Sequence, residues 1–207
     1  TLRSLVAKLE IKTGDYVVLL GDMIDRGPDS YDVIQFVKNS PNMATVKGNH
    51  EKMMAKAFSL SRLEKPDLRI STWFYNGGLS TATSYINAYT DSSGNENTQE
   101  LHQAIERDKL WIEQLPSQIV LDDWRLVHAG YDPNVDLDCQ TDRGEVWYSP
   151  LKLLDGRPAA IGLDTCVFHT TDSPAVLTAY NLQDGRVVQQ TRVEPWNNRA
   201  INQANKV

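Results

Sequence analysis

The stretch that decides the fold is Tyr16-Val-Val-Leu-Leu20, followed at once by Gly21-Asp22-Met-Ile-Asp25-Arg26-Gly27. Its first half is an uninterrupted apolar run with two adjacent valines, which is typical of a strand buried on both faces. Its second half is a loop that combines two carboxylates and an arginine with glycines, which allow tight turns. A strand that ends in such a loop predicts an α/β sheet with a polar site at the carboxyl ends of its strands.

A second pair of strand and loop repeats this arrangement. The short strand Ala44-Thr-Val46 leads into Gly48-Asn49-His50-Glu51. Because an open α/β sheet places the carboxyl ends of its strands at one rim, we expect both loops to lie there together. Their Asp, Asn and His side chains offer oxygen and imidazole ligands, the mixture that suits Mn, Fe, Zn or Mg.

The rest of the chain predicts helices around these strands and a second half richer in strands. We expect helices at 1–10, 30–39, 51–60, 79–88 and 98–114, and further strands at 117–121, 124–127, 159–163, 176–181 and 187–192. Residues 91–97 are typical of an exposed loop, and Asp184-Gly185 of a hairpin turn. This order predicts a single α/β domain with two sheets over residues 1–194 and a polar tail over 195–207.

Composition narrows the class of protein. The chain has 207 residues, of which 41% are hydrophobic and 23% charged, as in a globular protein. Its net charge of -6, with Lys and Arg scattered singly, argues against general nucleic-acid binding. No apolar run is long enough to cross a bilayer. Two cysteines, Cys139 and Cys166, are too few for a disulfide framework, which favours free thiols and a cytoplasmic location.

A family resemblance follows from these motifs taken in order. Gly21-Asp22-x-x-Asp25-Arg26-Gly27, Gly48-Asn49-His50-Glu51 and then His128-Ala129-Gly130 resemble the paired motifs of the PPP-class phosphatases, within the calcineurin-like metallophosphoesterases. Trp73…Asn76-Gly77-Gly78 is similar to the bacterial branch, which includes phage-type protein phosphatases and the symmetrical diadenosine tetraphosphatases. The resemblance implies a two-sheet β-sandwich flanked by helices, in four layers α/β/β/α.

The resemblance also implies a role for each motif residue. Asp22 resembles the carboxylate that bridges two divalent metal ions, and Asn49 and His128 resemble ligands of the second ion. His50, oriented by Asp25, resembles the general acid that protonates the leaving alkoxide. Arg26, together with Asn49, is expected to hold the substrate phosphate, for which a guanidinium is better suited than an ammonium.

The implied chemistry is hydrolysis of phosphomonoesters in phosphorylated proteins, by in-line attack of a hydroxide held by the metals. Manganese is the expected metal, with Fe, Zn or Mg as alternatives. Small phosphoesters are also possible substrates, and hydrolysis of dinucleoside polyphosphates is an alternative function. A third alternative is a non-catalytic, phosphatase-like binding domain.

That third alternative follows from two departures from the family pattern. The family's Asp-x-His motif, which precedes the first helix, and its Gly-His-Thr motif are not found in these 207 residues. His169 lies after Leu163-Asp164-Thr165-Cys166, which is the wrong side for a replacement. Arg143 and Arg157 are candidates for a second arginine that contacts phosphate.

Each motif residue also has a simpler reading. Asp22 and Asp25 are common in turns, and Asn49 is a common helix cap. His102 is predicted to be a solvated surface residue. Four of the five tryptophans are predicted to serve in packing, namely Trp73, Trp111, Trp124 and Trp147.

Overall fold

A computed structural model describes residues 1–59, 66–130, 135–136, 161–163, 167 and 175–193 of the chain, and these form two compact units. The larger unit includes everything described from Tyr16 to Ala129. The smaller unit includes Thr1–Asp15 and the described residues from Gly130 onwards. Each unit is described by itself.

The larger unit is organised on a parallel pair of strands. β1 (Val17–Leu19) pairs with β2 (Met43–Thr45), so that Val18 lies opposite Ala44. α2 (Ser30–Lys38) connects them, which makes a β-α-β unit. Parallel strands place their carboxyl ends at the same edge, and the loops that follow β1 and β2 therefore leave the sheet together, as the sequence predicts.

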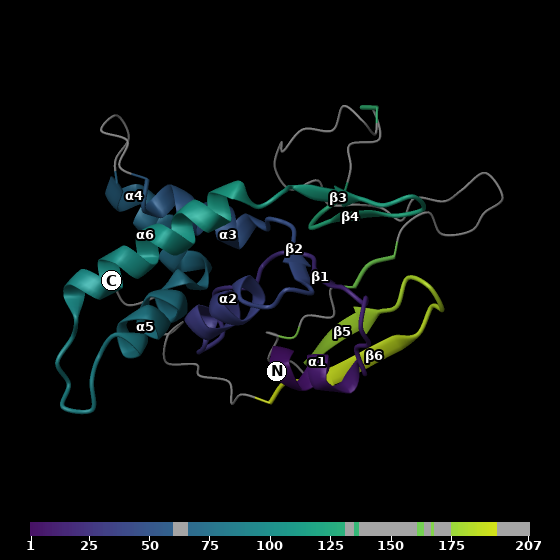
Figure 1. The fold of residues 1–207 in the computed structure, drawn as a ribbon. Helices are drawn as coiled ribbons and strands as arrows, with labels where there is room; N and C mark the ends of the chain where they lie inside the picture. Colours follow the sequence, from purple (N-terminus) through teal and green to yellow (C-terminus); the bar gives the residue numbers. More distant parts are fainter. Residues whose placement is uncertain (60–65, 131–134, 137–160, 164–166, 168–174, 194–207) are drawn as a thin grey trace. The chain divides into compact units, whose positions relative to one another are not determined.

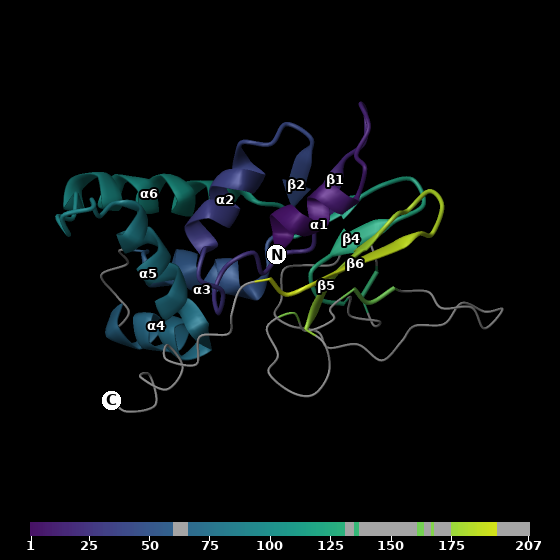
Figure 2. The same ribbon diagram turned by 90° about the horizontal axis from the view of Figure 1, so that it is seen from below.

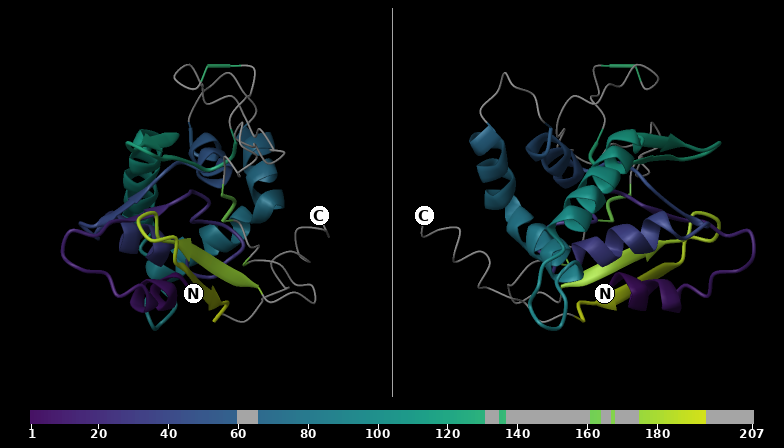
Figure 3. Two further views of the ribbon diagram at one scale, coloured as in Figure 1. Left: turned by 90° about the vertical axis from the view of Figure 1, so that its right-hand side faces the viewer. Right: turned by 60° about the vertical axis from the view of Figure 1, so that its left-hand side comes forward.

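The helices of this unit lie to one side of the β1–β2 pair (Figures 1 and 2). Four helices and one π-helical turn follow β2: α3 (Asn49–Ala57), α4 (Pro66–Trp73), η1 (Phe74–Gly78), α5 (Leu79–Ala88) and α6 (Thr98–Gln114). The segments α4, η1 and α5 are contiguous in the chain, with a kink at Gly77 (Figure 3). The core packs between the helices, with Ile34, Met54, Trp73, Tyr85 and Ile112 almost completely buried.

Antiparallel hairpins complete both units. In the larger unit, β3 (Gln118–Val120) pairs with β4 (Arg125–Val127), which leads directly to His128. In the smaller unit, β5 (Val176–Tyr180) pairs with β6 (Val187–Thr191). α1 (Leu2–Lys8) packs against this hairpin, as Figure 2 shows, and buries Leu5. No helix in the described part of the chain is both long and apolar enough to cross a membrane.

Most predicted elements are present, with some corrections. β1 is only half-buried, and Tyr16 is 71% exposed, because among the described strands β1 pairs with β2 alone. α3 begins at Asn49 with Gly48 as its cap, so Asn49 is not the cap. Residues 161–163 of the strand predicted at 159–163 are not in a strand, since Ile161 is 44% exposed and has no partner strand among the described residues.

Two elements were not predicted from sequence, and two predicted features remain untested. α4 and η1 occupy a stretch whose Gly77-Gly78 pair is more typical of a helix end. The α/β class is present, whereas the four-layer sandwich and the single domain over residues 1–194 remain predictions. The polar tail at 195–207 lies outside the described residues.

A buried carboxylate joins three of the helices. Asp108 on α6 is 2% exposed and accepts hydrogen bonds from Gln35 Nε2 and Lys38 Nζ on α2, each at 2.8 Å. It also accepts one from Tyr85 Oη on α5, at 2.9 Å. Burial, followed by the negative charge of Asp108, raises the pKa of Tyr85 well above its ordinary value, so this phenol remains a hydrogen-bond donor.

We expect Asp108→Ala to lower the free energy of unfolding by about 2 to 4 kcal/mol, because it leaves a lysine, an amide and a phenol without their shared acceptor. Urea unfolding followed by circular dichroism measures this loss. Asp122→Ala, in the exposed turn between β3 and β4, is the matched control and should change stability by less than about 0.5 kcal/mol. Equal effects of the two substitutions would contradict the role given to Asp108.

Candidate functional site

The loops after β1 and β2 are joined by one buried glutamate. Glu51 is fully buried, and its Oε2 accepts the backbone N–H groups of Asp22 and Gly48 while its Oε1 accepts that of Met23, all at 2.8 Å. Burial, and next the charge of Asp22, raise the pKa of Glu51, whereas these N–H groups oppose the rise. Sequence reasoning quoted Glu51 within its motif but gave it no role.

The two loops approach so closely that a side chain does not fit between them. A Cβ atom built on Gly48 would collide with Asp22 and would lie 2.7 Å from Oε2 of Glu51. The backbone N–H of His50 also donates to Oδ1 of Asp22, at 3.1 Å. Asp22 therefore lies at the amino-terminal end of α3, where a negative charge is favourable.

The first loop holds three functional candidates whose backbone conformation is uncommon. Asp22, Asp25 and Arg26 have φ angles of 52°, 71° and 64°, in the left-handed region that L-residues with a side chain seldom adopt. Such conformations are concentrated at functional sites, where the surrounding structure imposes them. Here the surroundings include Glu51, which fixes the backbone of Asp22, and Thr81, which accepts the N–H of Asp25 at 2.9 Å.

Asp25 and His50 form a buried pair. Their side chains are 0% and 2% exposed, and Nδ1 of His50 lies 2.6 Å from Oδ2 of Asp25. A carboxylate only accepts, so Nδ1 is the donor, and Nε2 is the ring nitrogen that faces the loops. Nε2 lies 4.0 Å from Oδ2 of Asp22.

Three electron-rich atoms converge beside this pair. Nδ1 of His128 lies 2.7 Å from the carbonyl oxygen of Leu20, which can only accept, so Nδ1 carries the proton. Nε2 of His128 then faces Oδ1 of Asn49 at 2.9 Å and Oδ2 of Asp22 at 3.3 Å. With a neutral imidazole, all three atoms present lone pairs to one point. Such a cluster requires either a proton on Nε2 or a cation.

The donor set fits a divalent metal ion. Ligand atoms that bind one ion at about 2.1 Å and at right angles lie about 3 Å apart, which matches the distances from Nε2 of His128 to the Asn49 and Asp22 oxygens. Asp22, Asn49 and His128 are therefore the residues that would hold it. The described part of the chain contains no group of three or more His, Cys, Asp and Glu side chains arranged for a metal, and the amide of Asn49 completes this set.

The pKa shifts of Asp22 and His128 also support a cation site. Burial lowers the pKa of His128, but the hydrogen bond and charge of Asp22 outweigh it, so that its pKa is raised from 6.5. For Asp22, burial acts to raise the pKa, but the hydrogen bond and charge of His128 outweigh it and lower the pKa. A cation that binds to this pair competes with the proton of His128.

The backbone of Arg26 is held by a residue of η1. Its backbone N–H donates to the carbonyl oxygen of Gly77 at 3.2 Å. Gly77 has φ 106°, and a Cβ atom there would lie 2.7 Å from Cγ of Arg26. The absence of a side chain at Gly77 is what allows η1 to approach Arg26, so the position requires glycine on two grounds.

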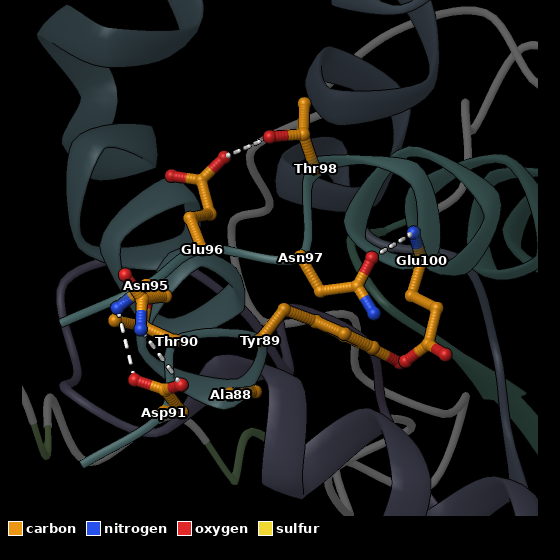
Figure 4. Close-up of a pocket in the computed structure, with 9 residues that line it drawn as sticks. All are labelled: Ala88, Tyr89, Thr90, Asp91, Asn95, Glu96, Asn97, Thr98 and Glu100. Atoms are coloured by element: carbon orange, nitrogen blue, oxygen red, sulfur yellow. Dashed lines mark hydrogen bonds between the residues drawn. The ribbon is translucent and has the colours of Figure 1, made fainter. Parts of the chain in front are cut away.

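A hollow elsewhere in the unit is not part of this site. It is lined by residues between Ala88 and Glu100, and Figure 4 shows Asp91 bound to Asn95, Glu96 bound to Thr98, and Asn97 capping α6. None of the predicted site residues lines it. Residues 91–97 are exposed, as the sequence predicts, and so is His102.

The structure thus brings together the side chains of Asp22, Asn49 and His128, and those of Asp25 and His50 beside them. Arg26 lies in the same loop as Asp22 and Asp25, with its backbone bonded to Gly77. Sequence reasoning missed Glu51 and Thr81, and it assigned Trp73 to packing alone. Trp73 does pack in the core, but its Nε1 also donates to Asp25. Several candidates lie outside the described residues, namely Cys139, Arg143, Trp147, Arg157, Cys166 and His169.

Comparison with known proteins agrees with the motifs. Residues 1–168 match the family described as Calcineurin-like phosphoesterase. The chain is 50% identical over 44 residues to Serine/threonine-protein phosphatase 2 of Escherichia coli (strain K12), which covers 21% of this chain and 20% of that protein. It is 42% identical over 66 residues to Serine/threonine-protein phosphatase 1 of Salmonella typhimurium, which covers 31% of this chain and 26% of that protein. The matched segments thus span only a fifth and about a quarter of these relatives.

We expect Glu51→Ala to lower the free energy of unfolding by about 3 to 5 kcal/mol, because three backbone N–H groups lose a buried acceptor. Glu113→Ala, on the exposed side of α6, removes the same charge and should have an effect below about 0.5 kcal/mol. Urea unfolding of both variants measures the difference. A loss for Glu51→Ala as small as that of its control would show that the glutamate does not hold the loops together.

We expect the affinity for Mn²⁺ to rise with pH by up to about tenfold per unit until the raised pKa of His128 is passed, because binding must displace its proton. At higher pH the affinity should level off. Titration calorimetry between about pH 6 and about pH 8.5 measures this profile.

Two substitutions complete that experiment. His128→Ala should weaken Mn²⁺ binding and flatten its pH profile, whereas His102→Ala, at an exposed histidine of α6, should leave both unchanged. An affinity of the unsubstituted protein that does not change over this range would contradict the proton displacement.

Proposed function

The chain belongs to the calcineurin-like phosphoesterase family, and on that premise we propose that it is a metal-dependent phosphatase that hydrolyses phosphoserine and phosphothreonine in proteins. The likeness to two bacterial serine/threonine-protein phosphatases supports this substrate class. The observation that carries the proposal is the position of His50, whose Nε2 faces the convergent atoms of Asp22, Asn49 and His128.

The family's enzymes use divalent metal ions, which polarise the phosphate and activate water when bound. We infer that Asp22, Asn49 and His128 hold an ion, with manganese as the expected metal. Asp22 would contribute Oδ2 to this set, because Oδ2 faces His128 while Oδ1 accepts the N–H of His50.

Proton donation and phosphate binding are assigned to other side chains of the chain. His50 carries a proton on Nε2 for the oxygen of the leaving alcohol, and Asp25 keeps the ring in this orientation from Nδ1. Arg26 and Asn49 hold the phosphate oxygens. Arg26 has a left-handed backbone held by Gly77, and it lies in the same loop that carries Asp22 and Asp25.

We expect the protein with Mn²⁺ to release phosphate from p-nitrophenyl phosphate and from a phosphothreonine peptide. His50→Ala should lower kcat for the peptide by about 10² to 10⁴, the range typical of a general acid. Phosphate release measured by a colorimetric assay is the readout, and His102→Ala is the matched control.

The same assay separates the alternatives. Faster turnover of diadenosine tetraphosphate than of the peptide would favour the dinucleoside polyphosphate hydrolase. A folded protein that binds Mn²⁺ but hydrolyses none of the three compounds would favour the non-catalytic binding domain. Activity of His50→Ala equal to that of the unsubstituted protein would contradict the role given to this histidine.

A further inference from the structure

The carboxylate of Asp25 is enclosed by hydrogen-bond donors that come from the helical segment α4-η1-α5. Nε1 of Trp73 lies 3.1 Å from Oδ1 and 3.0 Å from Oδ2 of Asp25. Thr81 Oγ1 donates to Oδ1 at 2.7 Å and in return accepts the backbone N–H of Asp25 at 2.9 Å. The side chain of Asp25 has no exposed surface, so water does not replace these partners.

These donors leave His50 only one way to bind. An indole N–H donates and never accepts, so Trp73 keeps both carboxylate oxygens of Asp25 in the role of acceptors. The ring of His50 must therefore present a protonated Nδ1 to Oδ2, at 2.6 Å. In a neutral imidazole this leaves the lone pair on Nε2, and in the charged form it leaves a proton there.

A kink at Gly77 lies between Trp73 and Thr81, which bond to the same carboxylate. In a regular α-helix, residues eight apart differ in direction by about 80° around the helix axis. The non-helical φ of 106° at Gly77, within η1 (Phe74–Gly78), changes this angle. Gly78 contributes as well, because a Cβ atom there would collide with the indole of Trp73.

We propose that Trp73 and Thr81 are positioning residues, which hold Asp25 so that His50 adopts the Nδ1–H tautomer and directs Nε2 at the leaving group. The catalytic part of this inference rests on the function proposed above. The structural part, namely the tautomer of His50, does not depend on activity.

The catalytic consequence depends on the leaving group. During hydrolysis a water oxygen bonds to phosphorus, having lost a proton to solvent, while the P–O bond to the leaving group breaks. The leaving oxygen keeps the electron pair and takes the Nε2 proton of the charged His50 imidazolium, which becomes the neutral Nδ1–H tautomer; solvent later restores the proton. The nitrophenolate anion is stable without this proton, whereas phenolate and alkoxides depend on it. Misplacing His50 should therefore harm substrates with basic leaving groups most.

The first experiment measures the tautomer directly. The full 207-residue chain is labelled with ¹⁵N in its histidine rings, and long-range ¹H–¹⁵N spectra are recorded without manganese. The signal of His50 is assigned by its loss in His50→Asn. We expect the Nδ1–H pattern in the unsubstituted protein and a mixture of both tautomers in Trp73→Phe and in Thr81→Val.

Three controls separate positioning from packing. Trp111→Phe removes the same atoms from a half-buried indole on α6, beside Lys38, and should keep the Nδ1–H pattern. Thr81→Ser retains the hydroxyl and should keep it too. Thr81→Val leaves the indole in the core. This variant therefore tests the effect on the His50 tautomer even if the cavity left by Trp73→Phe prevents folding. An unchanged His50 pattern in folded Thr81→Val or Trp73→Phe overturns the proposal.

The second experiment tests the catalytic consequence with Mn²⁺ and two substrates. We expect Trp73→Phe to lower kcat for phenyl phosphate at least about tenfold more than kcat for p-nitrophenyl phosphate. In a His50→Ala background, Trp73→Phe should have little further effect, since the two residues act through one group. Equal losses with both substrates overturn the catalytic part. A protein that hydrolyses neither ester contradicts the proposed function, while the spectra still decide the role of Trp73 and Thr81.

Discussion

The carboxylate of Glu51 is the constraint on which the site depends. The loops after β1 and β2 come from distant parts of the chain, and each needs its backbone N–H groups satisfied once they are buried. Glu51 accepts such groups from both loops at once, from the first turn of the helix that carries Asn49 and His50. One side chain thus fixes the position of Asp22 relative to these two neighbours. Charge-assisted bonds of this kind are stronger than neutral ones and impose a direction.

The positions of the charges follow from that constraint. Asp22 is fixed between the N-terminus of α3 and the ring of His128, and these contacts lower its pKa while raising that of His128. Asp25, three residues later, lies instead among buried donors and faces His50. Two carboxylates in one short loop therefore have different environments. One belongs to the convergent set of metal-binding atoms and the other to the proton donor, a division typical of hydrolytic sites.

Sequence patterns predicted the β-α-β frame and the meeting of the loops after β1 and β2, and they failed on contacts between distant segments. Apolar runs and loop motifs placed β1, β2 and the polar rim correctly, because strand direction alone brings the two loops together. The packing role of Trp73 was predicted, but a tryptophan pattern does not reveal that its N–H meets Asp25. α4 was not predicted, and Gly77 has the positive φ that a glycine pair favours; there the chain kinks between α4 and α5, beside Arg26.

The contiguous segments α4, η1 and α5, which kink at Gly77, also set which changes of length the chain can tolerate. An insertion or deletion of one residue between Trp73 and Thr81 would rotate one of these side chains by about 100° away from Asp25. Residues 91–97, by contrast, form an exposed loop between α5 and α6. Natural variants and engineered libraries should therefore vary freely in length in that loop, while the eight-residue interval from indole to hydroxyl stays invariant.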